Sequence, residues 1–181
     1  MREPRKYVDL LFMRRRRILP KRVLFSGEYY RVSTVAGKRN GVKIVGQEMN
    51  FTLSEMTHKN FDAYYSMWYR KSVRKIYQES MGRWISAMQA LGYNIEMPRI
   101  KIYRMRRAWG RCFYTKGVVT LSLYLGLMPR ECVDYVTLHE LCHFLVHTHS
   151  REFYTVMTNI DPEWKAKEQH LREFVVTHKI F

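Results

Sequence analysis

The hydrophobic and polar positions along the chain change their spacing several times, and each change predicts a new element. Over residues 60–91, apolar and aromatic side chains recur every three or four positions, which predicts a long amphipathic helix that ends before Gly92. Shorter apolar runs over residues 100–105 and 118–123 predict two strands. The middle of the chain is therefore predicted to be one long helix followed by part of a sheet.

The C-terminal third is predicted to be helical. Pro129 is suited to begin a helix, and residues 130–147 contain apolar positions at helical spacing and neither proline nor glycine. Ser150 is a suitable N-cap for a further helix, and a last helix is predicted near residues 163–174.

The N-terminal third follows a different pattern. Residues 29–35 and 41–45 are typical of strands and are joined by a turn over residues 37–41, which predicts a small β subdomain. We therefore divide the chain into a basic N-terminal segment (1–22), a small β subdomain (23–55) and a main domain (56–181). The fold is predicted to be α+β, with a mixed sheet and a long amphipathic helix.

The segment His139-Glu140-Leu141-Cys142-His143 carries the strongest chemical signal. Residues four apart on a helix lie on the same face, so both imidazoles are able to bind one metal ion, with the Glu140 carboxylate beside the first of them. A catalytic zinc ion takes three protein ligands, leaves the fourth position to water, lowers the pKa of that water and polarises a carbonyl oxygen. In such a site Glu140 is predicted to be the general base.

A third ligand must come from outside this helical turn. His147 lies two turns beyond His139, about 12 Å along a straight helix, which is too far for both to reach one ion. His149 follows His143 by six residues, which is enough for the helix to end and the chain to fold back, so we predict that His149 completes the site. The alternative third ligands are two downstream glutamates, Glu163 and Glu168.

Segments on both sides of the histidine motif carry a resemblance to a known family. They are Trp109-Gly110-Arg111-Cys112, Gly117-Val118-Val119-Thr120-Leu121, Asp134-Tyr135-Val136, His149-Ser150 with Phe153, and Asp161-Pro162-Glu163-Trp164. With the histidine motif they resemble the YgjP-like zinc metallopeptidases and, more distantly, the SprT-like proteases. Metzincins carry a glycine where this chain has Val146, which argues against that group.

The resemblance implies a zincin-like fold with an active-site helix that carries the HExxH motif. It also implies that His139, His143 and His149 bind Zn²⁺, that Glu140 is the catalytic base, and that the reaction is hydrolysis of peptide bonds. The family often has asparagine at the position of Ser122, so no role is assigned to that side chain.

Substrate binding and charge stabilisation leave several alternatives open. The predicted strand over residues 118–123 either offers an open edge to which an extended peptide adds as another strand, as is common in zincin proteases, or is an ordinary sheet strand. The candidates for stabilising negative charge on the carbonyl oxygen are Tyr124, Tyr154, Arg111 and His147.

The net charge of +16 is placed unevenly along the chain. Residues 1–50 contain 13 Lys and Arg against 4 Asp and Glu, residues 51–111 contain 12 against 4, and residues 112–181 contain 7 against 8. The regions before the histidine motif thus carry a positive charge that attracts polyanions. Nucleic acid is the suggested partner, by analogy with the SprT-like relatives. The alternative is that these are solvated surface charges with no partner. The candidate polyanion contacts are Arg14, Arg15, Arg16, Arg17, Arg104, Arg106 and Arg107.

The rest of the sequence indicates the cellular compartment in which the protein is expected. No stretch approaches the roughly 18 uninterrupted apolar residues of a membrane-spanning helix, and four arginines interrupt the short apolar run near the start, unlike a signal peptide. We therefore expect a soluble, cytoplasmic protein. Cys112, Cys132 and Cys142 lack the spacing of a zinc knuckle and are predicted to be reduced thiols.

Three functions remain open at the level of the residues. The leading hypothesis is a soluble zinc metallopeptidase that acts on peptides or proteins, in one version near nucleic acid. The second is a basic nucleic-acid-binding or scaffolding protein in which zinc only stabilises the fold. The third is a zinc hydrolase of non-peptide amides, because the metal chemistry is the same.

Overall fold

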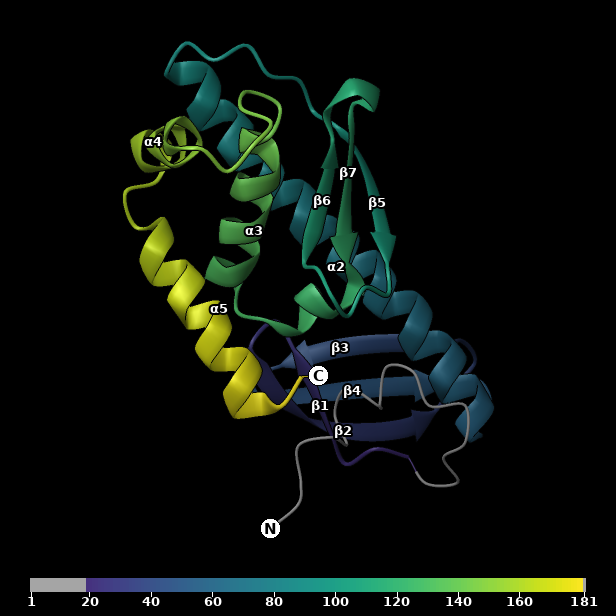
Figure 1. Ribbon diagram of the computed structural model, residues 1–181. Coiled ribbons are helices and arrows are strands. Elements are labelled where there is room, and N and C mark those ends of the chain that lie inside the picture. Colours follow the sequence, from purple (N-terminus) through teal and green to yellow (C-terminus); the bar gives the residue numbers. More distant parts are fainter. Residues whose placement is uncertain (1–18, 181) are drawn as a thin grey trace.

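The computed structural model describes residues 19–180, so Arg14, Arg15, Arg16, Arg17 and most of the predicted basic segment lie outside the described residues. In chain order the elements are β1 (Arg22–Phe25), β2 (Glu28–Ala36), β3 (Gly41–Val45), β4 (Glu48–Leu53), α2 (His58–Ala90), β5 (Arg99–Tyr103), β6 (Gly110–Phe113), the short 3-10 helix η1 (Tyr114–Lys116), β7 (Val118–Ser122), η2 (Leu123–Leu127), α3 (Arg130–Cys142), α4 (Arg151–Ile160) and α5 (Trp164–His178). Figure 1 shows two sheets with α2 running past both of them. The predicted α+β class is confirmed.

Helix α2 confirms the helix predicted over residues 60–91. The Thr57 side chain accepts a hydrogen bond from the Asn60 N–H at its start, and Gly92 follows its end with a φ of +85°, a value that favours glycine. Its buried stripe of large side chains packs against both sheets and α3. The stripe is formed by Phe61, Tyr65, Tyr69, Val73, Ile76, Tyr77, Met81, Ile85 and Met88.

The N-terminal sheet contains both predicted strands but pairs them differently from a hairpin. Its order is β1-β2-β4-β3, so β4 lies between β2 and β3, parallel to the first and antiparallel to the second. Strands β1 and β4 were not predicted. Met49, Phe51 and Leu53 alternate along β4 and are buried, and the Phe51 ring lies 4.9 Å from that of Phe61 on α2. These contacts show which face of β4 packs against α2.

The second sheet has the order β5-β7-β6, with β5 parallel and β6 antiparallel to β7. Strands β5 and β7 confirm the predictions for residues 100–105 and 118–123, and the sheet is mixed as predicted. Strand β6 was not predicted. Because β7 is paired on both sides, the first of the two alternatives for residues 118–123, an open edge, is wrong, and the second, an ordinary sheet strand, is confirmed. The edge beside α3 belongs to β6.

Hydrogen bonds fix α3 against α2. The Asp134 carboxylate on α3 accepts hydrogen bonds from Ser80 Oγ (2.5 Å) and Arg83 Nη2 (2.6 Å), and the Asp134 carbonyl oxygen accepts one from Trp84 Nε1 (2.9 Å). One hydrophobic cluster joins α2, α3 and both sheets. This core holds the active-site helix in a fixed position relative to the three-stranded sheet.

The C-terminal helices agree with the prediction except at two boundaries, of which one is the end of α5 at His178, beyond the predicted end near residue 174. Helix α3 ends at Cys142, earlier than the predicted end near residue 147, because the Leu145 and Val146 N–H groups both donate to the Cys142 carbonyl oxygen and close a tight turn. Helix α4 begins after Ser150, whose side chain accepts from the Phe153 N–H as an N-cap does. No helix of residues 19–180 is long and apolar enough to cross a membrane.

Candidate metal centre and active site

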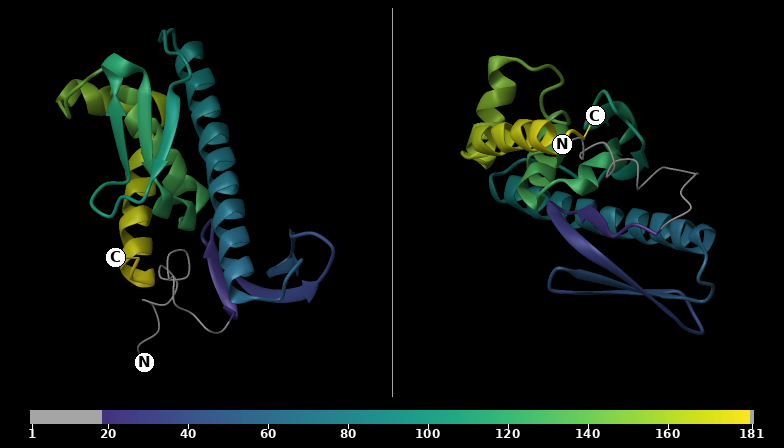
Figure 2. Two further views of the ribbon diagram at one scale, coloured as in Figure 1. Left: turned by 90° about the vertical axis from the view of Figure 1, so that its right-hand side faces the viewer. Right: turned by 90° about the horizontal axis from the view of Figure 1, so that it is seen from below.

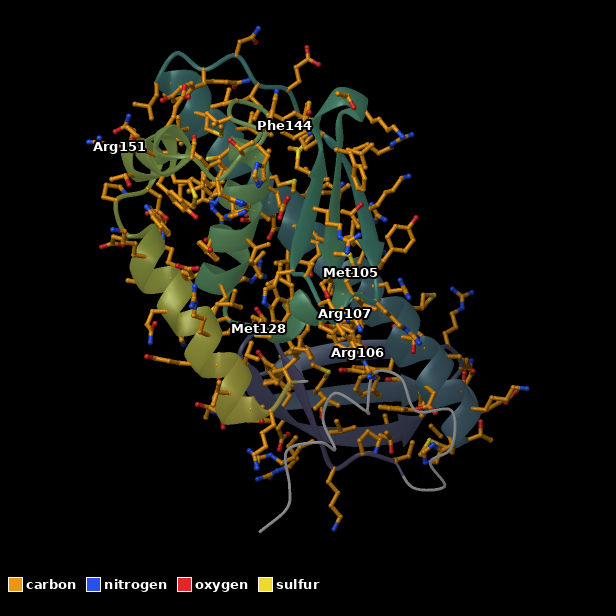
Figure 3. The ribbon with its side chains drawn as sticks, in the orientation of Figure 1. Met105, Arg106, Arg107, Met128, Phe144 and Arg151 are labelled. Carbon is orange, nitrogen blue, oxygen red and sulfur yellow. The ribbon has the colours of Figure 1, made fainter. Side chains whose placement is uncertain are left out.

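Two elements bring three histidines together. His139 and His143 lie one turn apart at the end of α3, and His149 lies in the connection to α4, immediately before the Ser150 cap. The turn after α3 reverses the chain direction, and Figure 3 labels Phe144 on this turn and Arg151 where α4 begins. The predicted fold-back of His149 toward the helix is therefore present in the structure.

The ring nitrogens of the three histidines form a compact group. The potential ligand atoms of His139, His143 and His149 all lie within 4.8 Å of one another, and His139 Nε2 is 2.9 Å from His149 Nε2. Phe153 is fully buried beneath them, with its ring centroid 4.7–5.0 Å from each of the three imidazole centroids. Capping by Ser150 thus positions both a histidine and the hydrophobic support under the group.

The protonation states suit a divalent cation. Burial, followed by the charges of His143 and His149, lowers the pKa of His139 to about 3, and burial also lowers the pKa of His143. The His143 Nδ1–H donates to the Val146 carbonyl oxygen (3.2 Å), which leaves the Nε2 lone pair of that ring available to a metal. Neutral imidazoles at this spacing fit a metal such as zinc, which prefers nitrogen ligands near 2.1 Å.

Glu140 lies next to the histidines in sequence but points toward β6. Its side chain is 5% exposed, and its carboxylate accepts a hydrogen bond from the Cys112 N–H. Burial raises the pKa of Glu140 to about 8, against the lowering effect of that hydrogen bond. A carboxyl group with a pKa near neutrality is suited to accept and return a proton.

Gly110 leaves the space that the Glu140 carboxylate occupies. A Cβ atom at residue 110 would lie 2.3 Å from Glu140 Oε1, so no larger residue fits without moving the carboxylate. In the sequence, Trp109-Gly110 contributed only to the family resemblance, and its contact with Glu140 was not predicted. Residue 110 must therefore lack a side chain if the Glu140 carboxylate is to hold this position.

A Gly110→Ala substitution is expected to lower turnover by about 10²-fold, since small displacements of a catalytic group have effects of this size. Metal content should not change, because the atoms nearest to a Cβ at residue 110 belong to Glu140 and not to the three histidines. Gly82→Ala is the matched control. A Cβ at residue 82 would meet only Met97 Cε at 3.9 Å, and alanine has a higher helix propensity than glycine in the middle of α2. The peptide cleavage rates and melting temperatures of both variants test this prediction. Equal cleavage rates for Gly110→Ala and the unchanged protein would contradict it.

A cavity of about 520 Å³ opens beside the histidines. Its lining comprises Tyr135, His139, His149, Tyr154, Trp164, Lys165, Glu168 and Arg172. The Trp164 ring stacks between those of Tyr135 (6.4 Å) and Tyr154 (5.5 Å), so one wall is aromatic. A second cavity of about 440 Å³ shares Tyr135, Glu168 and Arg172 and continues toward Trp109 and Val176. The two form one groove that leads away from the histidines.

At the polar end of this groove, Glu168 and Arg172 form an ion pair with each other. Glu168 Oε1 accepts a hydrogen bond from Arg172 Nη2 (2.7 Å), and the Tyr135 hydroxyl also donates to the Glu168 carboxylate. Burial and the Glu168 charge raise the pKa of Tyr135. Among the described residues the metal-ligand group contains neither Glu163 nor Glu168, so the structure favours His149 over the two glutamates as third member.

Other candidates lie in different places. His147 stacks on Tyr114 (3.7 Å between ring centroids) and, as expected, is not part of the histidine group. Of the four candidates for stabilising the carbonyl oxygen, Tyr154 lines the cavity, whereas Tyr124 is 2% exposed in the core and Arg111 is exposed on the sheet. Figure 3 labels Arg106 and Arg107 below the three-stranded sheet; these two and Arg104 are exposed and far along the chain from the histidines. The three cysteines are free thiols, as predicted.

The mixed sheet, the long helix and the HExxH helix define a metallopeptidase of the zincin-like class. The family model described as the YgjP-like metallopeptidase domain matches residues 11–174, and the chain belongs to this family. Among solved structures, the crystal structure of the metallopeptidase zymogen of Pyrococcus abyssi abylysin is similar, with 23% sequence identity, a TM-score of 0.45, and coverage of 52% of this chain and 90% of that chain. No curated protein matches the chain.

Proposed function

We propose that the protein is a zinc-dependent peptidase in which His139, His143 and His149 hold the metal and Glu140 is the general base. The observation that carries this proposal is the convergence of three histidines, whose potential ligand atoms lie within 4.8 Å of one another, with the buried Glu140 next to His139 on the same helix. Three neutral nitrogen ligands with one open position are typical of catalytic zinc, whereas structural zinc prefers four ligands and cysteines.

The proposed reaction divides the work between the metal and the protein. When bound, zinc supplies Lewis acidity, which polarises the scissile carbonyl and makes water more acidic. Glu140 accepts a proton from the attacking water and returns it to the leaving amine, and the Cys112 N–H holds the carboxylate in place for both transfers. The Tyr154 hydroxyl is the proposed donor to the carbonyl oxygen, since it lines the cavity beside His149.

We propose that the substrate lies along β6. This strand is an edge of the sheet, so an extended peptide is able to pair with it while its scissile bond faces the histidines. The adjoining 520 Å³ cavity with its stacked aromatic wall then receives a large apolar side chain of the substrate.

Metal analysis combined with cleavage assays tests the proposed function. The purified protein is expected to contain one zinc ion per chain and to cleave unfolded proteins and peptides with large apolar residues. A chelator should abolish cleavage, and added zinc should restore it. Cleavage that persists without metal, or hydrolysis confined to amides that contain no amino acids, would contradict the proposal and favour the other hypotheses.

Nucleic-acid binding is a second proposed property. The charge distribution supports it, because residues 97–130 contain eight Lys and Arg and no Asp or Glu. The binding would bring the peptidase near proteins associated with nucleic acid. Arg104, Arg106 and Arg107 are the proposed contacts among the described residues.

A further inference from the structure

The three-stranded sheet has one face that turns away from the histidines. Side chains alternate between the faces of a strand, and paired residues of neighbouring strands share a face. The pairs on this face are Arg99 with Val118, Lys101 with Thr120, Tyr103 with Ser122, Arg111 with Thr120, and Phe113 with Val118. Five long side chains on the outer strands therefore surround three short ones on β7. We call this group the outer sheet face.

The opposite face belongs to the core and the active site. Ile100, Val119 and Leu121 alternate with the outer residues and join the hydrophobic core, and Gly110 makes room for Glu140. The left view of Figure 2 shows the three strands toward the viewer, with the helices behind or beside them. The thickness of the sheet therefore separates the outer sheet face from the proposed catalytic residues.

The outer sheet face combines exposed rings with unpaired cations. Tyr103 is 56% exposed and Phe113 is 44% exposed, although folded proteins usually bury such side chains. Arg99, Lys101 and Arg111 are exposed as well, and none of the three forms an ion pair with a carboxylate of residues 19–180. A core-packing role explains neither the rings nor the cations.

The arrangement of these five side chains matches an extended polyanion with flat bases. Tyr103 and Phe113 lie at opposite corners, two strands and four residues apart, which corresponds to roughly 16 Å at standard strand spacings. Lys101 and Arg111 both pair with Thr120, so they flank the middle of the diagonal between the rings. Val118 and Thr120 between them are short and buried (3% and 6% exposed), so the contacts with a ligand come from the longer side chains around them.

We propose that the outer sheet face binds single-stranded nucleic acid. Bases stack on Tyr103 and Phe113, and the cations neutralise the phosphates between them. A duplex keeps its bases stacked inside and offers the rings no partner, so the rings favour a single strand. The inference rests on the nucleic-acid association proposed above, gives it a location, and does not depend on the peptidase activity.

Fluorescence anisotropy of the full chain with labelled oligonucleotides of about 12 nucleotides tests the proposal. Deoxyuridine and uridine strands are expected to bind more tightly than a duplex of equal length. These two strands differ only in the 2′-hydroxyl, so a difference between their affinities shows whether that group contributes. Each ring removed in Tyr103→Ala or Phe113→Ala should weaken binding about 5- to 150-fold. Tyr103→Phe should keep most of the affinity because the ring remains. Arg99→Ala should reduce the slope of log affinity against log salt by about 0.7.

Two comparisons distinguish the proposed location, the outer sheet face, from the proposed association with nucleic acid itself. Met67→Ala, which removes another exposed apolar side chain on α2, and the double variant Arg106→Ala/Arg107→Ala serve as controls. Single-strand binding that survives loss of both rings but falls in the double variant would overturn the outer sheet face and leave the proposed association standing. A complete lack of nucleic-acid binding by the unchanged protein would overturn both. Melting temperature verifies that both ring variants are folded. Peptide cleavage is a second check for Tyr103→Ala alone, because Phe113 lies on the strand that is proposed to bind the substrate.

Discussion

A Glu140→Gln variant is expected to lose about 10²- to 10⁴-fold of its turnover, the range typical of general acid–base catalysis, while it retains its metal. Glutamine has almost the same shape as glutamate, and its amide oxygen is able to accept the Cys112 N–H bond that the carboxylate accepts now. It does not accept a proton from water at neutral pH. The loss therefore isolates proton transfer from positioning.

Cleavage of a fluorogenic peptide and elemental analysis of the same preparation measure both parts of this prediction. Glu131→Gln is the matched control, because Glu131 lies on the same helix but its side chain is 49% exposed and pairs with His170. Full activity of Glu140→Gln would refute the proposed general base. Loss of metal together with activity would instead assign Glu140 to the structure of the histidine group.

Local patterns predicted the helices and the histidine group well. The aromatic stripe of α2 recurs at helical spacing because one face packs against the sheets, and the Ser150 cap is a local signal that depends on a few residues. The interval between His143 and His149 was sufficient to predict that the chain folds back. The end of α3 was not predictable in the same way, because residues 143–147 have no helix breaker. There His143 and His147 use Nδ1 to bond carbonyl oxygens of the turn, which stabilises the helix end.

Contacts between distant segments escaped prediction. Strand β4 lies between β2 and β3, and no local pattern in the sequence specifies that order. Strand β6 has only four residues, and with Gly110 and Cys112 among them the hydrophobic and polar positions do not alternate clearly. The space above Gly110 exists only because β6 and α3 are adjacent, so its relation to Glu140 depends on tertiary packing. The resemblance to the family marked the position of Trp109-Gly110 without giving this physical reason.

The outer sheet face shows the same limit. The sequence drew attention to Arg104, Arg106 and Arg107 because they are close together in the chain. Tyr103 and Phe113 become neighbours on one surface only through the register of both outer strands with β7. A basic run is thus visible in a sequence, whereas a surface that alternates rings and cations across strands requires the pairing to be known.

A His149→Ala variant is expected to lose detectable peptidase activity because two imidazoles remain where three are needed. Changes in residues that only orient zinc ligands lower metal affinity by about 10- to 100-fold, so removal of a ligand should lower it by at least about 100-fold. His139 and His143 remain on α3, and Phe153 still supports their rings, so the loss should not unfold the helix. Competition with a zinc-binding dye gives the affinity, and circular dichroism verifies the fold.

The matched control for this variant is His147→Ala. His147 lies between His143 and His149 in sequence, but its ring stacks on Tyr114 outside the histidine group, so its removal should leave the zinc affinity within a few-fold of the original. If His149→Ala still binds one zinc ion tightly, a carboxylate must replace the imidazole, and Glu168 is the nearest candidate because it lines the same cavity as His139. A Glu168→Gln change that then abolishes binding would assign the third ligand to α5, and the connection between α3 and α4 would lose its proposed role in holding the metal.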